Sequence, residues 1–375
     1  MSTSLAGLAV LLFSTAALAH AGESHHDEIG WTNWEVEPAI FMFTFIACLI
    51  YAAGILWRPR AEDPLRLWRH AAYFGGVAAV FVSLESPVDA MADHLFWMHQ
   101  IQHMLLRMIG PMLIALSAPQ AMLIAGLPSG LRRGALAPFA SSGAFRRIFS
   151  FLTDATVVTV LFIAALYVWQ YPPYHNAAIL NDDIHYTMHV TMLAAGLLFW
   201  WCIFDMRPPP MGLSYGTRLM MLWIATLAQI GLGAYTTLKG EVLYPAYNVA
   251  GRLFQTSPLT DETIGGFIIW VPSAMMCLLA AILVIHLWGA QETRADENRL
   301  AWLASNSDAS RYPTTGAELV AQARPKNRML AIGVLAFAVS MFGLAIFIGV
   351  LNQLNSETRN GLLAHAALVP HAAVR

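Results

Sequence analysis

The sequence predicts an all-α fold: a polytopic transmembrane helical bundle with about eight spans in the mature chain, preceded by an N-terminal signal peptide. Of its 375 residues, 57% are hydrophobic and only 12% are charged, whereas a soluble domain carries about 25% charged residues. The charged residues are concentrated between long apolar runs, and a helix needs ~20 apolar residues to cross a bilayer. We therefore expect one membrane domain and no soluble catalytic domain.

The N-terminal segment differs from the spans that follow it. Residues 1–19 form a short apolar run that ends in Ala-Leu-Ala just before His20. This pattern is typical of a cleaved signal peptide, with a retained membrane anchor as the alternative. Residues 20–37 then form a periplasmic tail, in which His20, His25 and His26 are expected to be auxiliary metal-capturing groups. An incidental polar terminus is the alternative interpretation of this tail.

Eight further apolar runs are long enough to cross, or nearly cross, the bilayer. The predicted spans are residues 39–57, 70–86, 95–118, 153–171, 186–205, 217–238, 263–289 and 329–351. Pro111 and Pro119 interrupt the third apolar run. Because proline removes a helix hydrogen bond, we expect a kink at Pro111 and the end of this span near Pro119.

The positive charges predict the orientation of the spans. Sixteen of the 21 Lys and Arg residues lie in the loops after spans one, three, five and seven. Cytoplasmic loops carry an excess of Lys and Arg, so this side of the bundle is predicted to be cytoplasmic. Residues 291–328 then form a cytoplasmic loop, with a short helix expected around Arg294–Leu303. Residues 352–375 form a periplasmic tail after the last span.

Two histidine pairs share one spacing in two separate spans. His99 and His103 lie at the start of the third span, and His185 and His189 lie at the start of the fifth. In a helix, residues i and i+4 lie on the same face, so each pair is a ready-made site with two imidazoles. Ionisable side chains within a membrane are costly and indicate function by default. If the two spans adjoin, the pairs lie at matching depth; the alternative is that they only stabilise the bundle.

Further groups that can bind a metal gather at the same outer end. Imidazoles suit Zn, Cu, Fe and Ni, thioethers favour Cu(I), and carboxylates can bind a metal or orient its ligands. The predicted metal-binding residues are His94, His99, His103, Met104, His185, Met188, His189 and Asp261. Methionine also fills gaps in cores, and Asp261 with Glu262 could simply cap a helix. We expect histidine to dominate the ligand set, with methionine secondary.

Arg107 complicates this prediction, because it follows His103 by four residues and extends the face of the first pair. A cation close to a metal ion opposes binding of that ion. A pair between Arg107 and an acidic residue, such as Glu85 or Asp261, would instead join two spans, but the partner of Arg107 cannot be read from the sequence.

Three segments, in order, resemble the motifs of a known family. SPVDAMADHLFWMHQIQHMLLRMIGPMLIALSAP, HYTMHVTMLAAGLLFWW and DETIGGFIIWVP are similar to segments of the CtaG-like cytochrome c oxidase assembly factors of bacterial membranes, of the caa-type oxidase kind. The resemblance covers residues 38–290, the first seven spans. The matching residues are His99, Gln102, His103, His185, His189, Asp261, Gly265 and Gly266. Glu262, Cys202 and Ser117 depart from the family pattern, where Gln, Pro and Gly are usual.

The resemblance implies a multi-pass protein of the bacterial inner (cytoplasmic) membrane that helps to mature a haem–copper oxidase. It also implies copper as the metal handled, with oxidase subunits or other assembly factors as partners beside the membrane lipid. The sequence contains no nucleophile–base pattern and no basic stripe outside the loops, so we expect neither an enzyme nor a nucleic-acid-binding protein. The alternatives are a haem b protein with one axial histidine from each of spans three and five, a metal or proton transporter, and a structural scaffold.

Overall fold

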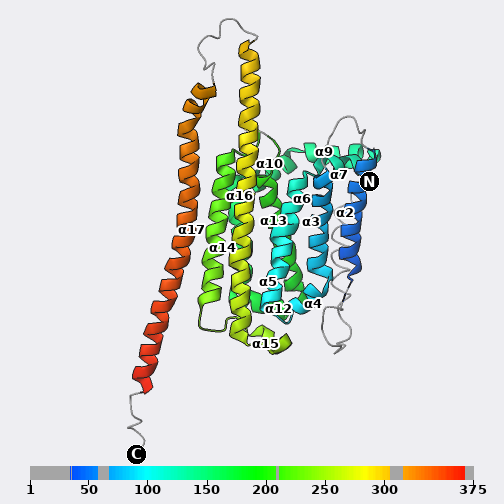
Figure 1. Cartoon of the computed structure of the whole chain (residues 1–375). Helices are drawn as coiled ribbons and strands as arrows, with labels where there is room; N and C mark the ends of the chain where they lie inside the picture. Colours follow the sequence, from blue (N-terminus) through cyan, green and yellow to red (C-terminus); the bar gives the residue numbers. More distant parts are fainter. Residues whose placement is uncertain (1–33, 35, 58–66, 208–210, 305–315, 368–375) are drawn as a thin grey trace, which may run out of the picture.

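The computed structural model describes residues 34, 36–57, 67–207, 211–304 and 316–367, and every regular element in these ranges is a helix. The predicted all-α polytopic fold is therefore confirmed. The predicted signal peptide and the tail histidines lie outside the described residues. The long helices run roughly parallel, and α17 lies at one edge of the bundle, beside α14 (Figure 1).

The long helices coincide with the predicted spans. They are α2 (Pro38–Trp57), α3 (Leu67–Glu85), α11 (Ala155–Gln170), α13 (Asp182–Ile203), α14 (Tyr215–Leu238), α16 (Pro258–Ala304) and α17 (Gly316–Ala367). Five helices of the described chain are long and apolar enough to cross a membrane, or up to seven when two bent pairs each count as one span. The helix α3, where we predicted the second span, is not among them. The number of eight spans therefore stays a prediction.

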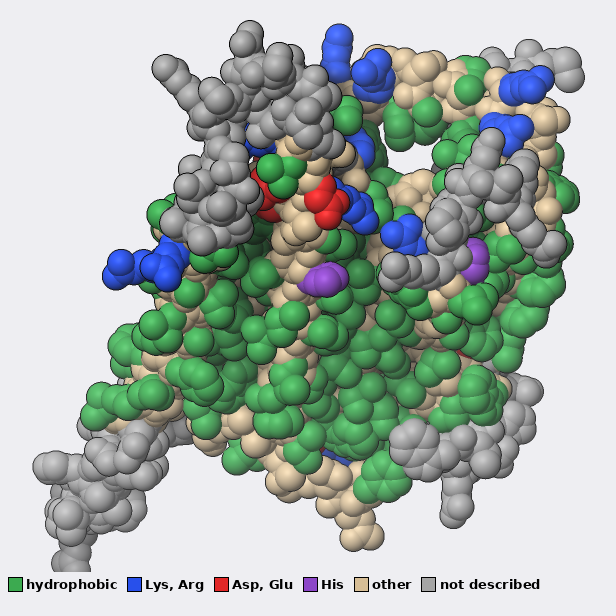
Figure 2. Space-filling view, turned by 45° about the horizontal axis from the view of Figure 1, so that its top comes forward, with side chains coloured by type: hydrophobic (Ala, Val, Ile, Leu, Met, Phe, Trp, Pro, Cys, Tyr) green, Lys and Arg blue, Asp and Glu red, His purple; other side chains and the backbone are tan. Residues whose placement is uncertain are grey.

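Short helices join the long ones at both ends of the bundle. They are α4 (Pro87–Ala92), α8 (Ser129–Leu131), η3 (Arg132–Leu136), α9 (Ala137–Ser141), α10 (Gly143–Leu152), α12 (Pro172–Ile179), α15 (Ala246–Ala250) and η4 (Leu253–Gln255). The helices α9 and α10 lie at one end, and α4, α12 and α15 lie at the opposite end (Figure 1). Figure 2 shows hydrophobic side chains over most of one face, with Lys and Arg side chains gathered toward the end that carries α9 and α10.

Two helices extend further than predicted. The segment around Arg294–Leu303 is not a separate short helix, because α16 continues without a break from Pro258 to Ala304. This segment is rich in Ala, Glu, Arg and Leu, which favour helix, so the chain has no local reason to stop at the end of the apolar run. In the same way, α17 runs beyond the predicted span 329–351 at both ends.

The third predicted span is interrupted, as its prolines indicate. The helix α5 (Phe96–Met104) passes through a π-helical turn, η2 (Leu105–Ile109), into α6 (Gly110–Ser117). The span ends at Ala118, which adopts a left-handed conformation with φ 49°. The next helix, α7 (Gln120–Gly126), is bent by 75° from the α5–α6 direction. The predicted end of the span near Pro119 is confirmed.

Pro111 leaves one backbone acceptor of this span without its usual partner. The missing N–H of Pro111 would have bonded to the carbonyl of Arg107, four residues earlier. Trp200 on α13 supplies the donor instead, because its indole Nε1 lies 3.2 Å from Arg107 O. A Cβ at Gly196 would lie only 2.5 Å from that oxygen, so glycine is needed for α13 to approach. The proline thus creates the contact that joins α13 to the third span.

The orientation of the bundle gives the first testable prediction. The structure places Arg133, in η3, at the opposite end from Asn176, in α12, and Val249, in α15. Because the positive loops mark the cytoplasmic side, reporter fusions at Arg133 should behave as cytoplasmic and fusions at Asn176 and Val249 as periplasmic. The reverse pattern would place the histidine pairs at the cytoplasmic surface and refute the orientation.

Candidate metal centre

Four histidine side chains meet where the first turns of α5 and α13 pack together. His99 and His103 come from α5, and His185 and His189 come from α13. The ring centres of His99 and His185 are 5.1 Å apart, and those of His103 and His189 are 5.8 Å apart. The two pairs therefore lie at matching depth, as expected if the two spans adjoin.

The nitrogens of these rings are incompletely hydrogen-bonded. His99 and His103 bond to each other, with their Nε2 atoms 2.8 Å apart. Among the described residues, no partner reaches Nδ1 of His99 or His103, or Nε2 of His185 or His189, although all four atoms are buried. A buried polar atom without a partner costs roughly 1–3 kcal/mol and calls for an explanation, such as an ion. The donor set therefore fits a metal ion.

Three of the rings come close to the geometry of a metal site. His99, His103 and His189 each offer one nitrogen, and these three atoms lie within 4.8 Å of one another. Two nitrogens bound to one tetrahedral ion at ~2.0–2.1 Å lie roughly 3.4 Å apart. A small inward movement of the rings would therefore complete a three-imidazole site. Neutral imidazoles suit Zn, Cu, Fe and Ni alike, so the geometry alone does not select the metal.

His185 links this cluster to the aqueous edge. Its Nδ1 lies 3.5 Å from Oδ1 of Asp93, and the side chain of His185 is 14% exposed, compared with 49% for Asp93. A carboxylate on one ring nitrogen orients the ring and makes the other nitrogen a better ligand. Among the four rings, His185 is therefore suited to meet an ion that arrives from the outer surface.

His175, which we did not predict as part of the site, packs against the cluster from α12. Its ring centre lies 5.1 Å from that of His99, and its side chain is fully buried. Nδ1 lies 2.9 Å from the carbonyl of Trp169, so this nitrogen carries the proton. Nε2, 2.9 Å from the hydroxyl of Tyr247, then accepts a hydrogen bond from it. Both nitrogens are used, so His175 supports His99 and leaves the ligand role to the other rings.

The buried state of His175 predicts an acid-sensitive fold. Burial lowers the pKa of His175 from 6.5 to about 4, although the bond to Trp169 opposes the shift. At pH values between about 4 and 6.5, the unfolded chain binds a proton at His175 that the folded chain does not bind. The free energy of unfolding therefore decreases as the pH falls below 6.5. From pH 7 to pH 5 this group should cost about 2 kcal/mol. The pH dependence of thermal unfolding should be shallower in His175→Gln; an unchanged slope would contradict this assignment.

Two predicted ligands have other partners in the structure. His94 lies outside the cluster, with its Nδ1 2.8 Å from the carbonyl of Gly251. Asp261 accepts hydrogen bonds from the backbone N–H groups of Phe96, at 3.1 Å, and Trp97, at 2.9 Å, and also pairs with Arg252. It therefore caps the first turn of α5 from a neighbouring helix. Both carboxylate oxygens are occupied, which is why Asp261 does not join the imidazoles.

The neighbouring Glu262 anchors the outer loop. Its carboxylate accepts the backbone N–H groups of Leu243, at 2.9 Å, and Tyr244, at 2.8 Å, and pairs with the ammonium of Lys239. Glu262 and Asp261 are both fully buried. The sequence offered two roles for these acids, a helix cap or a metal ligand. In the structure both carboxylates hold other elements in place around α5.

The two methionines among the predicted ligands lie beside the rings in apolar surroundings. Met188 is fully buried and packs in a cluster with Phe96, Leu166 and Tyr247. Met104 is partly buried and lines a small pocket next to His103. This agrees with histidine as the dominant ligand type, and metal binding by any of these residues stays a prediction.

Arg107, whose partner the sequence left open, forms no ion pair with an acidic residue of the described chain. Its Nη2 donates to the carbonyl of Phe162 at 3.0 Å, and its guanidinium lies 3.7 Å from the centre of the Phe162 ring. Glu85 accepts the backbone N–H of Glu37 instead, and Asp261 pairs with Arg252. An aromatic face and a carbonyl are therefore the partners of this guanidinium, in place of either carboxylate.

A comparison with known protein families finds a match to the region of the chain that contains this site. Residues 49–291 match the cytochrome c oxidase caa3 assembly factor family (Caa3_CtaG). The chain belongs to this family. All four histidines of the cluster, together with Asp261, lie within the matched residues.

Relatives of this chain occur in mycobacteria. It is 26% identical over 267 residues to uncharacterised proteins of Mycobacterium bovis and Mycobacterium tuberculosis, and 23% identical over 272 residues to one of Mycobacterium leprae. Each match covers 70% of this chain and 40% of the relative. The chain therefore spans well under half the length of these relatives. No solved structure matches it.

Proposed function

We propose that this caa3 assembly factor binds copper at the histidine cluster near the outer end of α5 and α13 and delivers it to a cytochrome c oxidase subunit. The observation that carries the proposal is the set of four buried histidines with unpartnered nitrogens, in a chain whose family assembles an oxidase. A haem–copper oxidase needs copper, and imidazole is a copper ligand.

The surroundings of the cluster support binding from the outer surface and release toward it. His185 and Asp93 connect the rings to the exposed edge of the bundle. On the inner side, Arg107 follows His103 by one helical turn and is 3% exposed. A buried cation at this position opposes passage of a metal ion toward the cytoplasm. The charges therefore favour a site that loads and unloads at one surface, as a chaperone requires, over a transport path.

The ring packing argues against the haem b alternative. The ring centres of His99 and His103 are 4.3 Å apart, and those of His185 and His189 are 4.4 Å apart. His99 also stacks on His185 across the two helices. A porphyrin between α5 and α13 would have to separate rings that are in contact, whereas a single ion needs only a small movement of them.

Metal analysis of the gently purified full chain tests the proposal. We expect about one copper ion per chain after reconstitution with Cu(I) or Cu(II) and removal of weakly bound metal, and we expect the loaded protein to restore copper to a copper-free oxidase subunit. Retention of zinc or iron in preference to copper would refute the copper assignment. A haem absorbance band in reduced-minus-oxidised spectra would favour the haem protein instead.

A further inference from the structure

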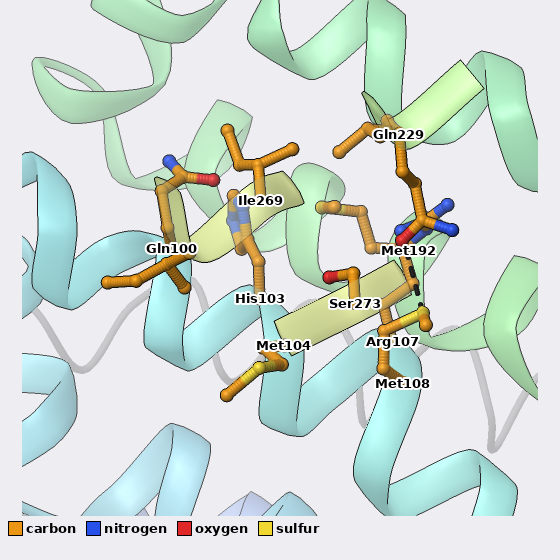
Figure 3. A pocket seen from close by; sticks show the side chains of 11 residues that line it. Gln100, His103, Met104, Arg107, Met108, Met192, Gln229, Ile269 and Ser273 are labelled. Atoms are coloured by element: carbon orange, nitrogen blue, oxygen red, sulfur yellow. Dashed lines mark hydrogen bonds between the residues drawn. The ribbon is translucent and has the colours of Figure 1, made fainter. Parts of the chain in front are cut away.

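A second polar site adjoins the histidine cluster and extends along α5 and η2 as far as Arg107. It is a small pocket among α5, η2, α11, α13, α14 and α16, and its polar lining residues are Gln100, His103, Arg107, Gln229 and Ser273 (Figure 3). Its free volume is about 10 Å³, which is room for about one water-sized sphere. The pocket can therefore hold one water molecule, or one monatomic ion if the flexible Met104 and Met108 side chains that line it yield slightly, but no polyatomic ligand such as phosphate.

The charge of Arg107 dominates this pocket. Its side chain is 3% exposed, and no carboxylate of the described residues forms an ion pair with it. Its Nη2 bonds to Phe162 O, its Nη1 lies 3.8 Å from the sulfur of Met108, and its Nε has no acceptor in the described chain. A buried charge is costly unless it is paired and hydrogen-bonded.

Gln100 contributes a second donor to the lining. Its Oε1 accepts a hydrogen bond from Nε2 of Gln170 at 2.6 Å, and this bond fixes the orientation of the Gln100 amide. Its Nε2 is then a buried donor without an acceptor among the described residues. The hydroxyl of Ser273, which also lines the pocket, can donate as well. The lining thus combines a cation with further donors and contains no acidic residue.

From this combination we infer that the pocket binds one small monovalent anion, of the halide class, on the guanidinium of Arg107. The anion neutralises a charge that no described carboxylate balances. It also reduces the repulsion between Arg107 and a cation held one turn away by His103. The competing occupant is a water molecule, which would accept a hydrogen bond from Arg107 and donate one to Oε1 of Gln229, another buried atom that has no partner in the described part of the chain.

Thermal unfolding of the metal-free full chain, with a chelator present, distinguishes the two occupants. Chloride or bromide, exchanged for gluconate at constant ionic strength, should raise the melting temperature in a saturable way, and labelled chloride should bind at about one ion per chain. Arg107→Gln should abolish both effects. The absence of any halide effect in the unaltered chain would show that water alone occupies the pocket, and would overturn the inference.

A matched control is available in a second buried arginine. Arg218 is 1% exposed, but its donors bond to the carbonyls of Leu213, Ile203, Asp205 and Arg207. The Arg218→Gln variant should have a lower melting temperature than the unaltered chain, but chloride or bromide should still raise that melting temperature. If Arg107→Gln does not accumulate, Gln100→Glu provides the second test, because a carboxylate in the lining competes with the anion. Halide affinity should then fall at least about tenfold, and unchanged affinity would overturn the inference.

Discussion

His103→Ala and His189→Ala are each expected to abolish copper retention and oxidase maturation while the protein stays inserted and abundant. These two rings come from different helices and, with His99, bring three nitrogens within 4.8 Å of one another. Removal of either leaves only two imidazoles within that distance, and two ligands hold a metal ion far less firmly than three. Copper content of the purified variants and the activity of the oxidase in the same membranes measure the effect.

His94→Ala is the matched control for these variants. His94 lies at the same end of the bundle, but its ring bonds to the carbonyl of Gly251, outside the cluster. It should retain copper and support maturation close to the level of the unaltered chain. The chaperone proposal loses its main support if His103→Ala and His189→Ala both retain metal, or if they fail only because the protein disappears from the membrane.

Asp261→Ala should be strongly destabilising, because Asp261 joins α16 to the start of α5. The substitution leaves Arg252, whose side chain is 6% exposed, without its nearest carboxylate, and leaves the N–H groups of Phe96 and Trp97 without their acceptor. Breaking a buried ion pair by removing one partner costs about 3–5 kcal/mol. Asp261→Asn should cost less, since an amide oxygen still accepts a backbone bond and Glu262 lies 4.0 Å from Arg252.

A partly exposed ion pair of the same residue types provides the comparison. Nη2 of Arg207 lies 2.7 Å from Oδ2 of Asp205, and the side chains are 56% and 11% exposed, compared with 6% and 0% for Arg252 and Asp261. A surface pair is worth about 0–1 kcal/mol, so Asp205→Ala should change the unfolding temperature little. Equal effects of Asp261→Ala and Asp205→Ala in denaturation of the purified protein would contradict the role assigned to Asp261.

The sequence was sufficient to predict the helices and the two histidine pairs, because both depend on local spacing. Apolar run length determines where a span can form, and the i, i+4 spacing places two rings on one face whatever the helix packs against. Pro119 likewise acts on its own helix, and the end of the span was correctly predicted.

The remaining features depend on contacts between segments far apart in the chain. His175 joins the cluster only because Trp169 and Tyr247 fix its ring, and Tyr247 lies 72 residues away. Asp261 accepts a hydrogen bond from the backbone of Phe96, 165 residues earlier. Its position near the start of α16 suggested a cap for α16, but its carboxylate caps α5. The guanidinium of Arg107 contacts the ring and the carbonyl of Phe162, and no feature of the sequence favours these partners over a carboxylate.

The bond between Trp200 and the carbonyl of Arg107 also limits how the two helices can move. It fixes α13 to the third span one turn below His103, where Gly196 brings the backbones into close contact. Sliding of one helix along the other would break this contact. Separation of the two histidine pairs is therefore expected to begin at their outer ends, the part of the helix pair that lies beyond this contact.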